Sequence, residues 1–162
     1  MTPRAAQLAD AQAIADIINP VIRETAISFN SKPKTLQDVA AEVEQTMANG
    51  HGFLIAEAAG AVLGFASYKQ FRAGPGYART AEHSIALAAD ARGRGVGRAL
   101  MQALEAHARA AGMHSMIAGV SGENPGGVVF HDRLGYAQVA VLPQVGWKFD
   151  RWLDLILMQK LL

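Results

Sequence analysis

The chain of 162 residues contains no cysteine, which excludes a disulfide framework, a thiolate nucleophile and any zinc site built on cysteine. It also lacks an excess of one charge, because 15 basic and 14 acidic residues give a formal net charge of +1. Proteins that attract nucleic acid or anionic lipid in bulk are far more basic, so we expect neither partner. No uncharged apolar run approaches the roughly 18 residues that a membrane helix needs, and residues 1–12 lack the apolar core of a secretion signal. These absences predict a cytoplasmic protein with no membrane segment.

What is present is a hydrophobic content of 51% with only 18% charged residues. This length and composition suit a single domain, here residues 1–162, that buries roughly two-thirds of its unfolded surface. No repeat, linker or low-complexity tract divides the chain.

Apolar residues recur at helical spacing in some segments and form short extended runs in others. The pattern predicts helices over residues 10–23, 35–49, 95–111 and 124–134. It predicts strands over residues 52–57, 62–68, 80–87, 113–120, 136–142 and 152–161. A helix joins strands 80–87 and 113–120, so these two are expected to be parallel. The fold class is therefore α/β, with helices packed on one mixed sheet.

Local signals add detail to these elements. Asp10 is expected to cap the first helix, and Pro20 should kink or split it. In the helix over residues 95–111, Glu105 is expected to face water and His107 to lie in the core. Residues 143–146, Pro-Gln-Val-Gly, are expected to separate the last two strands.

A glycine-rich turn precedes the helix over residues 95–111. Its sequence is Arg92-Gly-Arg-Gly-Val-Gly97, followed by Arg98. Alternate glycines remove Cβ atoms where a ligand approaches the main chain, and the unpaired N–H groups and dipole of the helix start favour an anion. This chemistry suits a pyrophosphate. A Walker loop needs a Lys-Ser or Lys-Thr that is missing, and a dinucleotide fingerprint needs glycine where Leu100 stands. The alternative is a glycine-rich turn with solvated arginines.

The Arg-x-x-Gly-x-Gly spacing of this turn resembles the acetyl-CoA loop of the GNAT N-acetyltransferases. Further segments are similar to the phosphinothricin and methionine sulfoximine acetyltransferase branch of that family, and they span nearly the whole chain. They are Phe71-Arg72, Thr80-x-Glu82-His83-Ser84, Asn124, His131-x-x-x-Gly135-Tyr136 and the tail from Pro143-Gln-Val-Gly146 to Leu155. The resemblance implies a GNAT fold: about seven mostly antiparallel strands, a parallel central pair splayed around acetyl-CoA, and about four helices.

Transfer of an acetyl group to an amine needs a base, because an alkyl ammonium has a pKa near 10 in water. Glu82 lies in the middle of a strand, a poor position for a carboxylate, and the resemblance assigns the base role to it. The alternative is a half-buried glutamate paired with Arg72 or Arg79. Strand alternation places Ser84 on the same face as Glu82, and His83 on the opposite face behind the sheet.

The resemblance also implies the residues that bind the cofactor. They are Ile85, Ala86, Leu87 and Ala88 on the strand of Glu82; Arg92, Gly93, Arg94, Gly95, Val96, Gly97 and Arg98 in the turn; and Asn124 and Gly127 at the start of the fourth helix. Two of these positions depart from the family. Ala86 replaces an aromatic residue, and Gly127 replaces a serine that contacts the cofactor.

On the substrate side, Arg72 is expected to bind a carboxylate through two parallel hydrogen bonds. The resemblance suggests that Thr25, Phe29, Pro75, Gly76 and Tyr77 line the same pocket. His131 stands where relatives in the wider superfamily place a tyrosine that protonates the leaving thiolate. It is interpreted either as that acid or as a packed helix residue.

These observations predict an acetyl-CoA-dependent N-acetyltransferase for a small amine of the methionine sulfoximine, methionine sulfone or phosphinothricin type. Rival functions are acetylation of a protein N-terminus or lysine, which predicts an open groove, acetylation of another small amine, and non-catalytic binding of CoA. No histidine spacing indicates a metal site. The tail, with Trp147, Lys148, Arg151 and Trp152, is expected to cover the substrate or to form a homodimer contact.

Overall fold

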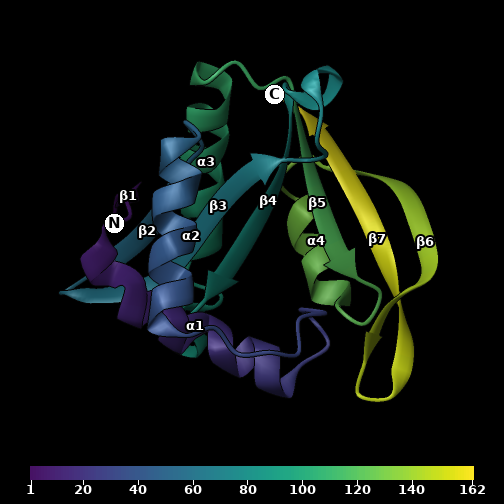
Figure 1. Cartoon of the computed structure of the whole chain (residues 1–162), viewed down its shortest axis with the longest axis horizontal. Coiled ribbons are helices and arrows are strands. Elements are labelled where there is room, and N and C mark those ends of the chain that lie inside the picture. Colours follow the sequence, from purple (N-terminus) through teal and green to yellow (C-terminus); the bar gives the residue numbers. More distant parts are fainter.

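The computed structural model describes all residues, 1–162. Four α-helices pack on a single sheet of seven strands, as the sequence and its family resemblance predict (Figure 1). The helices are α1 (Ala11–Glu24), α2 (Leu36–Ala48), α3 (Val96–Ala110) and α4 (Pro125–Asp132). The strands are β1 (Arg4–Ala5), β2 (Phe53–Ala58), β3 (Ala61–Gln70), β4 (Thr80–Leu87), β5 (Ser115–Ser121), β6 (Ala137–Lys148) and β7 (Arg151–Leu161). None of the helices is long and apolar enough to cross a bilayer.

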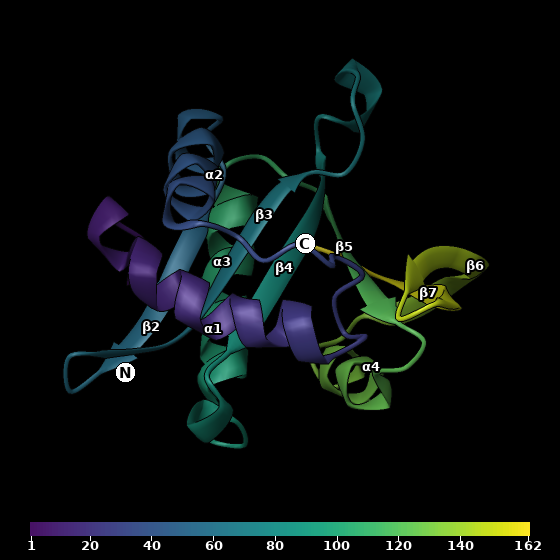
Figure 2. The ribbon, with the colours of Figure 1, turned by 60° about the horizontal axis from the view of Figure 1, so that its bottom comes forward.

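The strand order in the sheet is β1-β2-β3-β4-β5-β7-β6. Every neighbouring pair is antiparallel except β4 and β5, which run parallel as expected. Helices α1 and α2 cover one face, and α3 and α4 cover the other (Figure 2). The larger core lies under α3 and includes Leu100, Leu104 and Met116, whereas the smaller core lies under α1 and α2 and includes Ile14 and Phe65. The sheet therefore separates two apolar layers.

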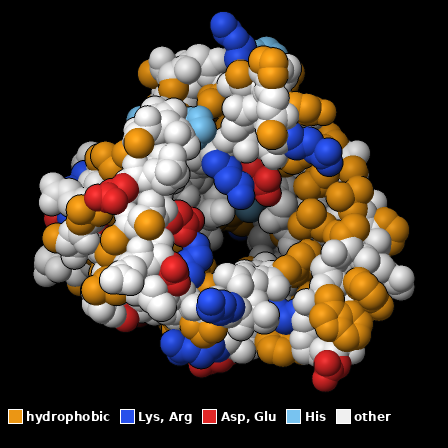
Figure 3. All heavy atoms as spheres, in the orientation of Figure 1, with side chains coloured by type: hydrophobic (Ala, Val, Ile, Leu, Met, Phe, Trp, Pro, Cys, Tyr) orange, Lys and Arg blue, Asp and Glu red, His pale blue; other side chains and the backbone are white.

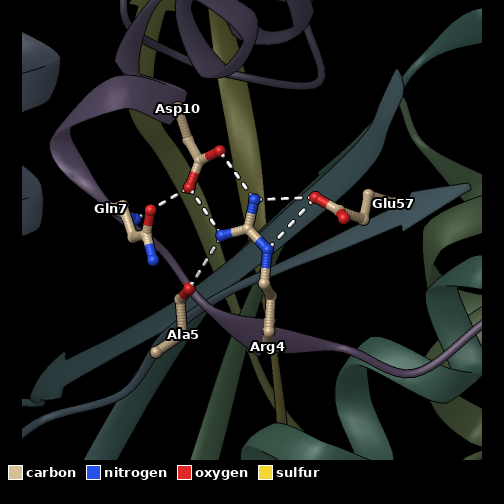
Figure 4. A network of polar contacts seen from close by, with 5 residues as sticks. All are labelled: Arg4, Ala5, Gln7, Asp10 and Glu57. Carbon is tan, nitrogen blue, oxygen red and sulfur yellow. Dashed lines mark hydrogen bonds and ion pairs between the residues drawn. The ribbon is translucent and has the colours of Figure 1, made fainter. Parts of the chain in front are cut away.

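The first helix departs from the sequence prediction at Asp10, and at Pro20 it excludes one of the two predicted outcomes. The Asp10 side chain does not cap α1, because Arg4 donates to both of its carboxylate oxygens at 2.9 Å and the Gln7 N–H donates at 2.7 Å. Arg4 also binds Glu57, so this network joins β1 and β2 to the start of α1 (Figure 4). Pro20 does not split α1, since buried Ile17 and Ile22 on either side of it anchor both halves of the helix to the protein interior.

The predicted environment of α3 is also corrected. Glu105 is buried rather than solvated, because Tyr136 Oη donates to it at 3.1 Å and Lys160 Nζ at 2.6 Å. His107 is exposed and not in the core, although its Nδ1 lies 3.0 Å from Tyr68 Oη.

The last two strands are longer than predicted. Residues 143–146 do not form the turn but lie within β6, where the register with β7 shifts between Leu142 and Gly146. The turn consists of Phe149 and Asp150, whose φ angles of +53° and +56° are typical of a tight two-residue hairpin. The result is one long hairpin, the β6–β7 hairpin, at the edge of the sheet (Figure 1).

Candidate active site

Strands β4 and β5 part in the middle of the sheet. Their parallel pairing runs from Thr80 opposite Ser115 to His83 opposite Ala118 and stops there. β4 continues to Leu87 and β5 to Ser121, so main-chain groups of β4 beyond His83 face β5 without a ladder partner. On its other side this part of β4 still pairs with β3. The arrangement is a slot whose walls are two diverging strands.

Glu82 lies at the point where this slot begins. Its carboxylate is half-buried and forms no hydrogen bond or ion pair with any side chain, so the expected alternative of pairing with Arg72 or Arg79 is not found. A Cβ added to Gly119 of β5 would lie 3.4 Å from Glu82 Oε1, which shows that the carboxylate reaches across the parting strands. Ser84 is exposed on the same face and His83 is buried on the other, as predicted. Such a carboxylate is free to accept a proton from a ligand.

The predicted cofactor residues of β4 lie along one wall of the slot and alternate between the two faces of the sheet. Ile85 and Leu87 are half-buried beside the larger core, and Ala86 is buried in the smaller core under α1. The Ala88 N–H donates to Leu63 O at 2.9 Å, which anchors the end of β4 to β3. The alanine that replaces an aromatic residue at position 86 thus belongs to the packing under α1.

The glycine-rich turn leads directly into α3 and borders a cavity of about 700 Å³ between α3 and α4. Leu87, Arg92, Gly93, Gly95, Val96, Gly97 and Arg98 all line this cavity, together with residues of α4. Arg94 does not line it and instead donates to Asp90 O at 3.4 Å. Since neither Arg92 nor Arg98 forms an ion pair with the protein, both cations are available to an anionic ligand.

At two positions of this turn, 95 and 97, the structure explains why the residue is glycine. Gly95 precedes α3 with a φ of +80°, a left-handed conformation that is costly for other residues. Gly97 faces α4, and a Cβ there would come within 3.1 Å of the Phe130 ring. The turn is therefore open around Gly95 and closes against α4 at Gly97.

Asn124 and Gly127 lie at the start of α4. The Asn124 side chain caps the helix by accepting the Gly127 N–H at 3.0 Å, a role that suits an asparagine at this position. A Cβ at Gly127 would lie 2.5 Å from Asn124 Nδ2 and 3.0 Å from Val120. The amide of Asn124 thus occupies the space in which a serine side chain would begin, so a serine at this position would require the amide to shift.

His131 is buried on the far side of the sheet from Glu82. Its Nδ1 lies 2.7 Å from Gly127 O, and its Nε2 lies 3.1 Å from Nε2 of His83. Burial lowers the pKa of both rings, that of His83 to about 3. With both ring nitrogens engaged in the interior, the geometry favours the packed alternative over the acid for a leaving thiolate.

Arg72 belongs to an exposed loop between β3 and β4 that projects from the sheet (Figure 2). Gln70 Nε2 supports this loop by donating to Arg72 O and Gly74 O, both at 2.7 Å. The guanidinium lies 5.6 Å from the Phe71 ring and forms no ion pair. Pro75, Gly76 and Tyr77 form a single exposed 3-10 turn at the tip of the loop.

Thr25 and Phe29 lie in the segment between α1 and α2, which the β6–β7 hairpin holds in place. Lys148, only 3% exposed, donates from Nζ to Thr25 O at 2.6 Å and to Ser28 O at 2.7 Å. The Phe29 ring packs on Gly146, where an added Cβ would lie 2.5 Å from it. The sequence did not indicate this role for Lys148, since its partners are backbone oxygens more than 100 positions away.

The face shown in Figure 3 combines these features. A hollow near its middle is rimmed by basic and acidic side chains, and hydrophobic side chains gather over the side that carries β6 and β7. No group of three or more His, Asp or Glu side chains is close enough together to hold a metal ion. The site offers an unpaired carboxylate, the unpaired cations Arg92 and Arg98, and main-chain groups of β4 without a ladder partner on β5.

Comparison with known proteins agrees with this geometry. Residues 19–136 match the acetyltransferase (GNAT) family. The L-methionine sulfoximine/L-methionine sulfone acetyltransferase of Pseudomonas paraeruginosa is 41% identical over 157 residues, covering 96% of this chain and 91% of that protein.

Solved structures show the same similarity. A ribosomal-protein-alanine N-acetyltransferase from Brucella melitensis superposes with a TM-score of 0.97 at 36% identity and covers 100% of both chains. A phosphinothricin acetyltransferase from Sinorhizobium meliloti, in complex with acetyl-CoA, superposes with a TM-score of 0.94 at 31% identity and covers 99% of this chain and 88% of that one. The chain belongs to the GNAT family of acetyltransferases.

Proposed function

We propose that this chain transfers the acetyl group of acetyl-CoA to the amine of a small amino-acid-like substrate, with Glu82 as the general base. The observation that carries the proposal is the unpaired Glu82 carboxylate at the point where β4 and β5 part. The glycine-rich turn and its cavity of about 700 Å³ support the binding of a pyrophosphate at the other end of the same slot.

The residues of the turn and of α4 fit acetyl-CoA. Arg92, Arg98 and the N–H groups of the first turn of α3 would hold the pyrophosphate. Asn124 would contact the pantetheine arm, whereas Gly127 offers no side-chain hydrogen bond. The acetyl group would then lie beside the free main-chain groups of β4.

The chemistry follows from this arrangement. Glu82 accepts a proton from the substrate ammonium, directly or through water, because only the neutral amine has a lone pair. The amine nitrogen then forms a bond to the thioester carbonyl carbon, the carbon–sulfur bond breaks with its electrons leaving on the thiolate, and the excess proton of the acylated nitrogen passes to that thiolate, which leaves as the free thiol. Unpaired N–H groups of β4 would stabilise the developing oxyanion. The absence of cysteine favours direct attack without a thioester on the enzyme.

The proposal that the substrate is an amino acid rests on Arg72. Its guanidinium has no partner in the protein and can donate two parallel hydrogen bonds to a carboxylate. The names of the methionine sulfoximine/sulfone and phosphinothricin relatives support the same class. The similarity to a ribosomal-protein-alanine N-acetyltransferase favours a second candidate, acetylation of a protein N-terminus. The exposed position of the Arg72 loop is compatible with that larger substrate.

Release of free thiol from acetyl-CoA tests the two candidates side by side. We expect saturable turnover with L-methionine sulfoximine, L-methionine sulfone or phosphinothricin, and little with an alanine-starting peptide or a lysine peptide. Turnover of the peptides alone would overturn the small-molecule assignment. No thiol release with any amine, while the protein still binds acetyl-CoA, would favour a non-catalytic binding module.

The same proposal includes a homodimer formed through the β6–β7 hairpin, together with the cytoplasmic location expected from the sequence. Val139, Val145, Trp147 and Trp152 of the hairpin are each more than half exposed, an apolar surface that association would cover. Light scattering should give twice the 17.2 kDa of one chain. A mass of one chain at working concentration would contradict it.

A further inference from the structure

A second cavity, of about 550 Å³, lies between the C-terminal end of α2 and the loop that carries Arg72. The residues that line it are Asn49, His51, Lys69, Gln70, Arg72, Ala73 and Gly74. Two of them carry a permanent positive charge, a third is a histidine, and none is acidic. The lining of this cavity is therefore suited to an anion.

Neither permanent cation of the cavity is neutralised by the protein. No ion pair includes Lys69 or Arg72, and neither side chain forms a hydrogen bond. In addition, the buried Nδ1 atom of His51 has no hydrogen-bond partner. Like charges that lie close together repel each other unless a counter-ion joins them. A ligand with more than one negative charge would satisfy both cations.

The position of Lys69 connects this cavity to the reacting amine. Lys69 on β3 pairs directly with Glu82 on β4, and side chains directly opposite in an antiparallel pair share one face with Cβ atoms about 5 Å apart. Glu82 reaches the other way, toward Gly119 of β5. An amine at Glu82 therefore leaves the rest of the substrate free to extend over β3 toward Lys69 and Arg72.

We propose that Lys69 is a specificity-determining residue that binds a second anionic group, such as a phosphinate or carboxylate on the side chain of an amino-acid substrate. The inference rests on the proposed function, in which Glu82 binds the amine and Arg72 the α-carboxylate. It adds a preference: among amino acids of equal shape, the enzyme selects the one with the additional negative charge.

Phosphinothricin and L-methionine sulfone form a matched pair for the test. Both have a methyl-capped tetrahedral head group on a side chain of the same length, but the first has a phosphinate anion where the second has a neutral sulfone. The experiment measures kcat/KM for both in the wild type, Lys69→Met and Lys69→Arg. The control is Arg79→Met, which removes an exposed cation that does not line the cavity.

The expected result is a wild-type ratio of kcat/KM that favours phosphinothricin and falls about five- to tenfold in Lys69→Met, the effect of one charge-assisted hydrogen bond in a partly solvated site. Lys69→Arg should restore most of the ratio, Arg79→Met should keep it, and added salt should reduce it in the wild type. An equal loss with both substrates would overturn the proposal and make Lys69 a neighbour of Glu82 with no role in selectivity. An unchanged ratio would overturn it too. If the wild type acetylates neither compound, the proposed function has failed rather than the role of Lys69.

Discussion

The two ends of the candidate site are built in different ways. The proposed cofactor end consists of consecutive residues, Arg92–Arg98, which pass from a glycine-rich turn into the first turn of α3. The proposed substrate end draws on separate segments, which are Thr25 and Phe29 before α2, the Arg72 loop and the β6–β7 hairpin, and the contact from Lys148 to Thr25 spans 123 positions. A consecutive motif binds its ligand through its own backbone, whereas an assembled region depends on the contacts that hold its parts together. Substitutions should therefore affect the two ends differently.

The largest effect is expected at Glu82, which lies between the two ends. Glu82→Gln keeps the shape of the side chain but removes its ability to accept a proton, so kcat should fall by about 10²–10⁴. Binding of acetyl-CoA, measured by calorimetry, should stay within about twofold of the wild type. Full turnover in this variant would refute the base role.

Lys148 is the residue on which the assembled substrate end most depends. Lys148→Met leaves the Thr25 and Ser28 carbonyl oxygens without their donor, which should lower the free energy of unfolding by about 2 kcal/mol. Urea denaturation measures this loss, and Lys148→Arg should recover part of it because it restores a donor. Equal stability of Lys148→Met and the wild type would show that the hydrogen bonds from Lys148 to Thr25 O and Ser28 O contribute nothing to folding stability.

Low pH should destabilise the protein through the buried pair of His83 and His131, which lies on the face of the sheet opposite Glu82. Burial, with a smaller contribution from His131, lowers the pKa of His83 from 6.5 to about 3. Below pH 6.5 the unfolded chain therefore binds a proton that the folded chain does not, and stability is lost as the pH falls. Between pH 6.5 and 5 we expect a loss of about 2 kcal/mol from His83, with a further contribution from His131, whose pKa is also lowered. Urea midpoints across this range should fall more steeply in the wild type than in His83→Leu, and parallel slopes would contradict the assignment.

A smaller effect is expected in the consecutive cofactor turn. Gly95→Ala forces alanine into a φ of +80°, at a cost of about 1 kcal/mol, although no atom lies within 4 Å of the new Cβ. The matched control is Gly126→Ala, where φ is not positive and the nearest atom lies 3.8 Å away. Thermal denaturation should separate the two variants, and an equal melting temperature would show that the turn is not strained.

This difference between the ends also explains what the sequence could predict. The bounds of β4, the parallel β4–β5 pair and the glycine-rich turn before α3 all follow from neighbouring residues or short periods. The failures involve distant partners. Glu105 looked solvated because its partners come from later in the chain, Tyr136 from just before β6 and Lys160 from β7. Asp10 looked like a cap because its partner Arg4 is positioned by β2.

The β6–β7 hairpin follows the same rule. Its Pro-Gln-Val-Gly segment has the composition of a turn, but it forms only an irregularity within β6, because Leu142 and Gly146 pair with Leu155 and Leu153 of β7, and the turn lies at Phe149 and Asp150. Only that pairing places Lys148 and Gly146 over the segment that contains Thr25 and Phe29. Local sequence carries no signal for such a contact.

The most direct test of two differently built ends is an initial-rate grid that varies acetyl-CoA and the amine together in the wild type, Gly95→Ala and Lys148→Met. We predict that Gly95→Ala raises the KM for acetyl-CoA and leaves that for the amine unchanged, whereas Lys148→Met raises only the KM for the amine. If both Michaelis constants rise together in both variants, the two ends act as one unit and the account is wrong.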